Sequence, residues 1–136
     1  MPLVSRKGML AIAAVIDVAI NARSRPVSAK ALAARHKLPP RHLEPVLQAL
    51  VREGILKGIR GPHGGYEIAR EFHLITAEHI LRAAGSAEDT EDSVIPASGL
   101  VTDVVLPALV EAERTFSSAL GQITVEEMAK QAQSLH

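Results

Sequence analysis

Apolar residues recur with a helical period through the first part of the chain. Residues 5–22 predict one helix, in which Asp17 lies on the face opposite the apolar side chains. Ser28 is a suitable N-cap for a short second helix over residues 29–35, and a tight turn follows it. A third helix is expected over residues 40–53, because four apolar residues form one stripe along it: Leu43, Val46, Leu47 and Leu50.

The pattern changes around the segment IRGPHGGY, residues 59–66. Glycines at this density indicate a tight turn with positive φ, or a backbone that something must approach closely. The flanking residues 55–59 and 66–69 alternate roughly as strands do, so they predict a β-hairpin with a basic, glycine-rich tip. Two short helices joined by a tight turn and followed by a hairpin are the order of a winged helix-turn-helix. In that fold the second helix of the pair enters the major groove of DNA and the hairpin is the wing.

The rest of the chain is again helical in pattern. A helix is expected to start at Thr76, which is a suitable N-cap. Residues 85–98 are small and acidic and predict a loop. A long helical pattern covers residues 99–120, where Pro107 predicts either a kink or a fresh start. Residues 124–127 (TVEE) fit the capping box of a last short helix.

The predicted fold class is therefore mainly α with a small β-hairpin wing. We expect a winged helix-turn-helix DNA-binding domain over residues 1–84, the acidic loop over residues 85–98, and a long dimerisation helix with a C-terminal helix over residues 99–136. The apolar stripe of the long helix exceeds what one helix needs to cover a small domain. It predicts a homodimer through four residues: Val105, Leu109, Phe116 and Leu120.

Charge is divided unevenly along the chain. Residues 1–82 contain thirteen Lys and Arg against six Asp and Glu, a net charge of +7, and residues 83–136 contain two against nine, a net charge of −7. A basic half followed by an acidic half suggests that the first half meets a polyanion. The alternative is a chance distribution of charge over a solvated surface.

A set of positions also matches a known family. These positions are Lys7-Gly8, Ala11, Asp17, Ala19, Leu32-Ala33, Leu43-Glu44, Leu47, Leu50, Gly54-Ile55-Leu56, Arg60-Gly61-Pro62, Gly64-Gly65-Tyr66, Ala69, Ile75-Thr76 and Ile80. Through them the chain resembles the BadM/Rrf-type transcriptional regulators (IscR-, NsrR- and CymR-like), strongly over about residues 3–84 and in outline beyond. The resemblance implies a homodimer that binds palindromic DNA, and many members of the family repress transcription.

The chain also departs from that family. Several members hold an iron–sulfur cluster or sense redox state through cysteines in the loop before the dimerisation helix, whereas this sequence has no cysteine. A signal would then come from a small molecule in the cleft between the DNA-binding and dimerisation parts, from a partner, or from the abundance of the protein alone. Leu10 and His42 stand where aromatic residues are usual, and Pro45 inside the third helix predicts a bend near its DNA-facing end.

The basic and glycine-rich positions of the first half are the candidate DNA contacts. Arg60 suits the minor groove, and Arg41 with His42 suits phosphates or base edges. Glu44 either turns aside or accepts a hydrogen bond from a cytosine amino group, and the resemblance favours the second role. Each basic residue alone could instead be solvated. The full predicted set is Arg6, Lys7, Ser28, Lys30, Arg41, His42, Glu44, Arg60, Gly61, His63, Gly64 and Gly65.

Other function classes have little support in the sequence. The absence of cysteine excludes disulfides, thiolate metal sites and thiol nucleophiles, and we expect no cofactor. The spacing of His73 and His79 does not suit one helical face, and the acids at residues 88–92 are better explained as a solvated loop, so no metal site is predicted. No phosphate-binding loop or nucleophile–base pair indicates an enzyme. A protein-interaction module and a metal-dependent protein remain the alternatives.

No apolar run approaches the length of a membrane span, and the N-terminus has no signal-peptide pattern. The expected location is therefore the cytoplasm.

Overall fold

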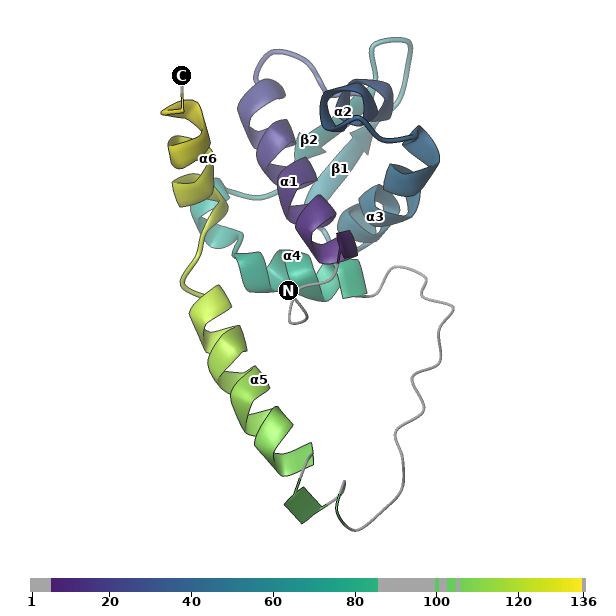
Figure 1. Cartoon of the computed structure of the whole chain (residues 1–136). Helices are drawn as coiled ribbons and strands as arrows, with labels where there is room; N and C mark the ends of the chain where they lie inside the picture. The colour runs from purple at the N-terminus through teal and green to yellow at the C-terminus, as the bar shows by residue number, and fades with distance from the viewer. Residues whose placement is uncertain (1–5, 86–99, 101–102, 105, 136) are drawn as a thin grey trace.

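A computed structural model of the chain describes residues 6–85, 100, 103–104 and 106–135 (Figure 1). In that part of the chain the elements are α1 (Arg6–Asn21), α2 (Ala29–His36), α3 (Pro40–Arg52), β1 (Leu56–Ile59), β2 (Gly65–Ile68), the 3₁₀-helix η1 (Phe72–Leu74), α4 (Ala77–Gly85), α5 (Leu106–Leu120) and α6 (Val125–Gln133). The predicted fold class, mainly helical with one β-hairpin, is confirmed.

The helix-turn-helix pair is α2 and α3. The Ser28 side chain accepts a hydrogen bond from the Ala31 N–H at 3.0 Å, as expected of an N-cap. Lys37 closes α2 in the left-handed region, with φ of 56°, and turns the chain toward α3. Pro40 occupies the first position of α3, where its missing N–H costs nothing. The helix then continues through Pro45.

The core lies where α1 crosses the other helices. α1 packs against α3, α4, α6 and β2, as its central place in Figure 1 indicates. The core is built from aliphatic side chains, as the composition requires. Its largest fully buried members are Val15, Val18, Leu32, Leu43, Val46, Leu47, Leu50, Ile55, Leu56, Ile75, Ile80 and Val125.

The hairpin is an antiparallel pair in which Leu56 is opposite Ile68 and Ile59 is opposite Gly65. One residue from before α2 extends this sheet, because Val27 forms a bridge with Tyr66. The Val27 N–H donates to the Tyr66 carbonyl at 3.0 Å, and the Tyr66 N–H donates to the Val27 carbonyl at 2.8 Å. This bridge fixes the hairpin to the start of the helix-turn-helix pair.

The last helix returns to the N-terminal part of the fold. Thr124 caps α6 by accepting from the Glu127 N–H at 3.2 Å, which is one of the two hydrogen bonds of the predicted capping box. Thr124 also forms a bridge with Thr76, at the start of α4. As a result Val125 is part of the core. By contrast, α5 extends away from the rest of the molecule (Figure 1), and it begins at Leu106, directly before Pro107.

Candidate nucleic-acid interface

The wing, residues 56–68, depends on its glycines in two different ways. Gly61 has a φ of +117°, a value that side chains rarely allow, although a Cβ there would meet nothing within 4 Å. Gly64 and Gly65 instead lie against backbone: a Cβ on Gly64 would strike the Ile59 carbonyl, and one on Gly65 would strike the Val27 carbonyl. The close approach that these two glycines permit is therefore made by the chain itself. Their approach to DNA stays a prediction.

A groove separates the wing from the start of α2. Its volume is about 470 Å³, and we call it the wing groove. It brings together two predicted contacts from distant parts of the sequence, Ser28 and Arg60, with Gly61, Gly64 and Gly65 between them. Arg60 is exposed, and no hydrogen bond or ion pair to another described residue holds its guanidinium. The side chain is therefore available to a ligand.

A second pocket, of about 400 Å³, lies under the tip of the wing and is here called the tip pocket. It joins His63, one of the predicted contacts, to Arg25 and Arg35. Neither arginine belongs to the predicted set. Arg25 could have been identified from the sequence, because it lies in the short connection before Ser28. Loops that flank a helix-turn-helix pair often contact the DNA backbone. The pairing with His63, however, depends on how the wing folds back.

The start of α3 presents a polar face to solvent. Arg41, His42 and Glu44 are exposed, while the stripe on the other side of the helix (Leu43, Val46, Leu47 and Leu50) is buried as predicted. Among the described residues, no ion pair or hydrogen bond involves the side chain of Glu44. This geometry leaves the exposed face of α3 free to enter a groove of DNA.

The three remaining basic contacts of the predicted set are Arg6, Lys7 and Lys30. Arg6 and Lys7 form the first turn of α1, whereas Asn21, at the other end of the same helix, lines the tip pocket. Fifteen residue steps separate Arg6 from Asn21, roughly 22 Å at 1.5 Å per residue. Lys30 is exposed on α2, directly after Ala29, which lines the wing groove. Contact of DNA with these three residues stays a prediction.

Asp17 is the one polar or charged residue among the buried residues of the described chain. The helical pattern places it opposite the apolar side chains, yet it is only 8% exposed. The reason is a set of partners on α2: Arg35 donates from Nε at 2.8 Å and from Nη2 at 2.7 Å, and His36 Nε2 lies 3.1 Å away. Asn21 Nδ2 donates to the same carboxylate at 3.1 Å. A buried carboxylate is stable when its oxygens are satisfied in this way.

This arrangement changes the acidity of both partners. Burial raises the pKa of Asp17, but the hydrogen bonds from Arg35 and Asn21 and the attraction of Arg35 and His36 outweigh burial and lower it overall. The hydrogen bond to Asp17 raises the pKa of Arg35. Asp17 therefore joins α1 to α2 as a charged group, and it holds the helix that precedes α3 in place.

The predicted dimerisation stripe is described only in part. Val105 and the side chain of Leu109 lie outside the described residues, while Phe116 and Leu120 are half-buried on α5. The same helix and the short segment before it expose further apolar side chains, Leu100, Val104 and Val110. An exposed apolar surface of this kind is typical of an interface.

The residues considered for metal binding do not form a cluster. Within the described chain no three His, Asp or Glu side chains come together as metal ligands would. His79 lies at the start of α4, where its Nδ1 accepts from the Thr76 N–H at 3.3 Å, and His73 lies 3.7 Å from Glu71. The acids at residues 88–92 lie outside the described residues. Over the same described part, no helix has the length and apolarity needed to span a bilayer.

Comparison with known proteins identifies the family. The family model of Rrf2, an iron-dependent transcriptional regulator, matches residues 4–131. The structure of IscR from T. potens has a TM-score of 0.74 and 30% sequence identity, over 98% of this chain and 90% of that one. The structure of CymR, the global cysteine regulator of B. subtilis, has a TM-score of 0.70 and 26% identity, over 94% and 96%.

Iron is named in the description of the family, and the residues of this chain do not fit a thiolate-held iron site. The whole sequence has no cysteine, so neither a cluster nor a thiolate-bound ion has its ligands here. The described histidines and carboxylates do not gather into a replacement set.

A protein of Haemophilus influenzae named as a helix-turn-helix transcriptional regulator is 35% identical over 77 residues. That match covers 57% of this chain and about half, 51%, of the relative. The relatives are regulators of transcription rather than enzymes. The chain belongs to the Rrf2 family of DNA-binding transcriptional regulators.

Proposed function

We propose that this protein is a homodimeric repressor that binds a palindromic DNA operator, with α3 in the major groove and the wing in the minor groove. The observation that supports the proposal best is the wing groove. There an unpaired Arg60 and the N-cap of α2 lie on one surface, and α2 packs against α3, whose start is polar and exposed. A surface that is basic and lacks internal ion pairs is suited to phosphates and base edges.

Each part of this surface has a separate role in the proposal. Arg60 contacts the minor groove, where narrow A·T-rich sequence attracts arginine. Arg41 and His42 contact phosphates or base edges, and Glu44 accepts from a cytosine amino group. Ser28, Lys30 and His63 contact the phosphate backbone of the DNA on either side of the groove. The dimer places two such surfaces on the two halves of a palindrome, and occupation of a promoter would block transcription.

The proposal is tested by binding to the promoter of the protein's own gene. The full chain should shift a labelled promoter fragment, and the logarithm of the affinity should fall linearly and steeply with the logarithm of salt concentration. A scrambled fragment of the same composition is the control, and it should bind much more weakly. A chain that binds neither fragment at low salt would point to the protein-interaction module instead.

A further inference from the structure

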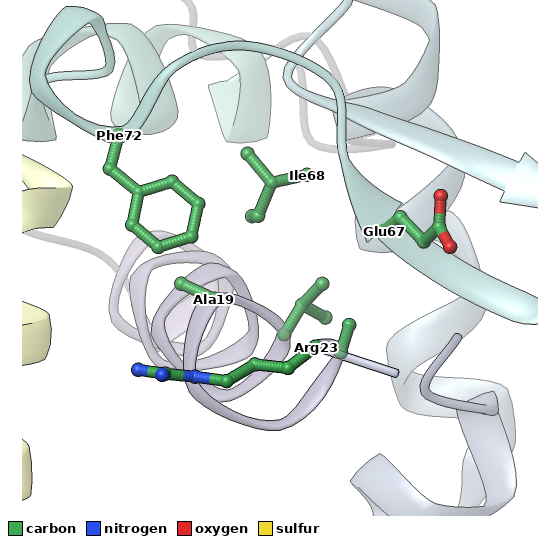
Figure 2. A pocket seen from close by; sticks show the side chains of 7 residues that line it. Ala19, Arg23, Glu67, Ile68 and Phe72 are labelled. Carbon is green, nitrogen blue, oxygen red and sulfur yellow. The ribbon is translucent and has the colours of Figure 1, made fainter. Parts of the chain in front are cut away.

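A third cavity lies on the side of the domain, between the end of α1 and the chain that leaves the wing (Figure 2). Its volume is about 600 Å³, and we call it the side cavity. Val18 and Ala19 of α1, with Ala22 just after it, form one wall, and Ile68 of β2 with Phe72 of η1 forms the other. In Figure 2 the Phe72 ring, Ile68 and Ala19 face one another across the opening. The side chains of these five residues are all apolar.

Two charged residues also line the side cavity, and they are not equivalent. Glu67 lies 3.7 Å from Lys57 across the hairpin, so its charge is compensated. Arg23 is exposed, and no described residue forms an ion pair or hydrogen bond with it. Figure 2 shows the Arg23 side chain lying along α1 beneath Ala19 and Phe72, while Glu67 is at the other end. The site therefore combines five apolar side chains with one cation that no described residue compensates.

The size and the lining decide the class of ligand. Small-molecule sites are commonly 300–1,000 Å³, mostly apolar, with a few polar groups that fix orientation. A guanidinium pairs best with a carboxylate, through two parallel hydrogen bonds. An apolar chain or ring would lie against Phe72 and Ile68. We propose that the side cavity binds a small organic carboxylate with an apolar chain or ring, and that this ligand changes the affinity for DNA.

The link to DNA binding, which rests on the proposed function, follows from the elements around the cavity. Ile68 and Glu67 belong to β2. The preceding residue of the same strand, Tyr66, forms a bridge with Val27 just before α2. Arg23 belongs to the connection between α1 and α2. A ligand held between them would tie the wing to the helix pair and so favour one arrangement of the DNA-binding surface.

The test begins without DNA, so that it does not depend on the proposed function. Amide chemical shifts of the full chain are followed by NMR during titration with hexanoate, hexan-1-ol and acetate. Hexanoate has both the chain and the charge, and should shift residues 18–23 and 66–72 with an affinity at least about tenfold above the other two probes. Shifts confined to other regions, or equal affinity for hexanoate and acetate, would overturn the site.

Variants separate the two features of the cavity. R23Q should weaken hexanoate about tenfold and leave hexan-1-ol unchanged, because only the charged contact is lost. R114Q, in an exposed arginine of α5, is the control and should change neither. A22L, which fills the cavity, should weaken both probes. Equal hexanoate affinity in R23Q and R114Q would refute the role of Arg23.

DNA is added last. Saturating hexanoate should change promoter affinity of the wild type at least threefold in either direction and leave that of R23Q unchanged at the same concentration. A wild type that binds hexanoate and DNA independently would refute the regulatory half of the inference. A chain that binds hexanoate but no DNA would instead count against the proposed function.

Discussion

A single carboxylate, that of Asp17, determines how α1 and α2 meet. It is buried, and it accepts hydrogen bonds from Arg35 and Asn21 while His36 lies beside it. Breaking a buried, satisfied charge pair removes the attraction and leaves donors without an acceptor. Arg35 is 44% exposed, so water can replace part of what it loses. Removing Asp17 should therefore lower the free energy of unfolding by less than removing one member of a wholly buried pair would.

We expect Asp17→Asn to lower the free energy of unfolding by about 1–3 kcal/mol at pH 7. Chemical denaturation measures the change. Glu111→Gln, which removes an exposed ion pair with Arg114, is the control and should stay within about 0.5 kcal/mol of the wild type.

The same contact has a defined pH dependence. The pKa of Asp17 is lowered in the folded protein, so its contribution is complete above the ordinary carboxyl pKa of about 3.9 and is lost as pH falls through the lowered folded value. The difference in stability between wild type and Asp17→Asn should thus shrink steadily in acid. A difference that stays constant from pH 7 to pH 3 would show that the carboxylate is not the source of the stabilisation.

Two glycines of the wing, Gly65 and Gly58, allow a matched comparison of the effect of one added methyl group on stability. Gly65→Ala should lower the free energy of unfolding by about 1–3 kcal/mol, since the new methyl group meets the Val27 backbone and φ is +156°. Gly58→Ala, two strand residues from the tip, meets nothing within 4 Å and should be neutral. Thermal unfolding of both variants distinguishes them, and equal midpoints would contradict the packing described here.

At the scale of elements, the wing is expected to contribute to affinity more than to stability. Arg60→Ala should leave the fold intact and weaken operator binding by roughly 1–3 kcal/mol, the usual size of one specific contact. Arg114→Ala removes an arginine of the same charge from α5 and should have little effect. Fluorescence anisotropy with a promoter duplex provides the measurement, and unchanged binding by Arg60→Ala would remove the wing from the interface.

Local signals in the sequence are enough to define most elements. The predicted ends of α1, α2, α3 and the two strands each fall within one residue of the observed ends. Their periods, caps and turns depend on neighbouring residues, which a sequence displays directly. η1 and the bridge from Val27 to Tyr66 have no such signal, because three residues or a single pair cannot show a period.

The candidate site was less accessible from the sequence. The wing motif and the start of α3 supplied most of its residues, because their roles follow from position in a helix-turn-helix. The burial of Asp17 depends on Arg35, eighteen residues further along, and a helical period assigns a face without naming a partner. The tip pocket and the side cavity arise only where the wing folds against α1. Tertiary packing of this kind is not encoded in any short stretch.

The whole molecule is expected to work as a pair of chains. α5 projects from the body and exposes Val110, and the half-buried Phe116 lies on the same helix (Figure 1). Covering such a surface with a second copy would remove apolar area from water and place two wings on one duplex.

Sedimentation at micromolar concentration should therefore give about twice the mass of one chain. Phe116→Glu should shift the protein toward the monomer, because a charge would enter the apolar contact. Thr115→Glu adds the same charge one position earlier, at an exposed residue, and should leave the mass unchanged. A wild type that sediments as one chain would contradict the dimer.

The bridge between Thr76 and Thr124 has a consequence for the order in which the protein is made. α1 leaves the ribosome about a hundred residues before α6, and at 5–20 residues per second that interval is roughly 5–20 s. Until α6 arrives, the face of α1 that it covers has no partner within the nascent chain. The cover of α1 is thus completed only after α6 has left the ribosome, and a message truncated before Val125 would yield a chain whose α1 lacks part of that cover.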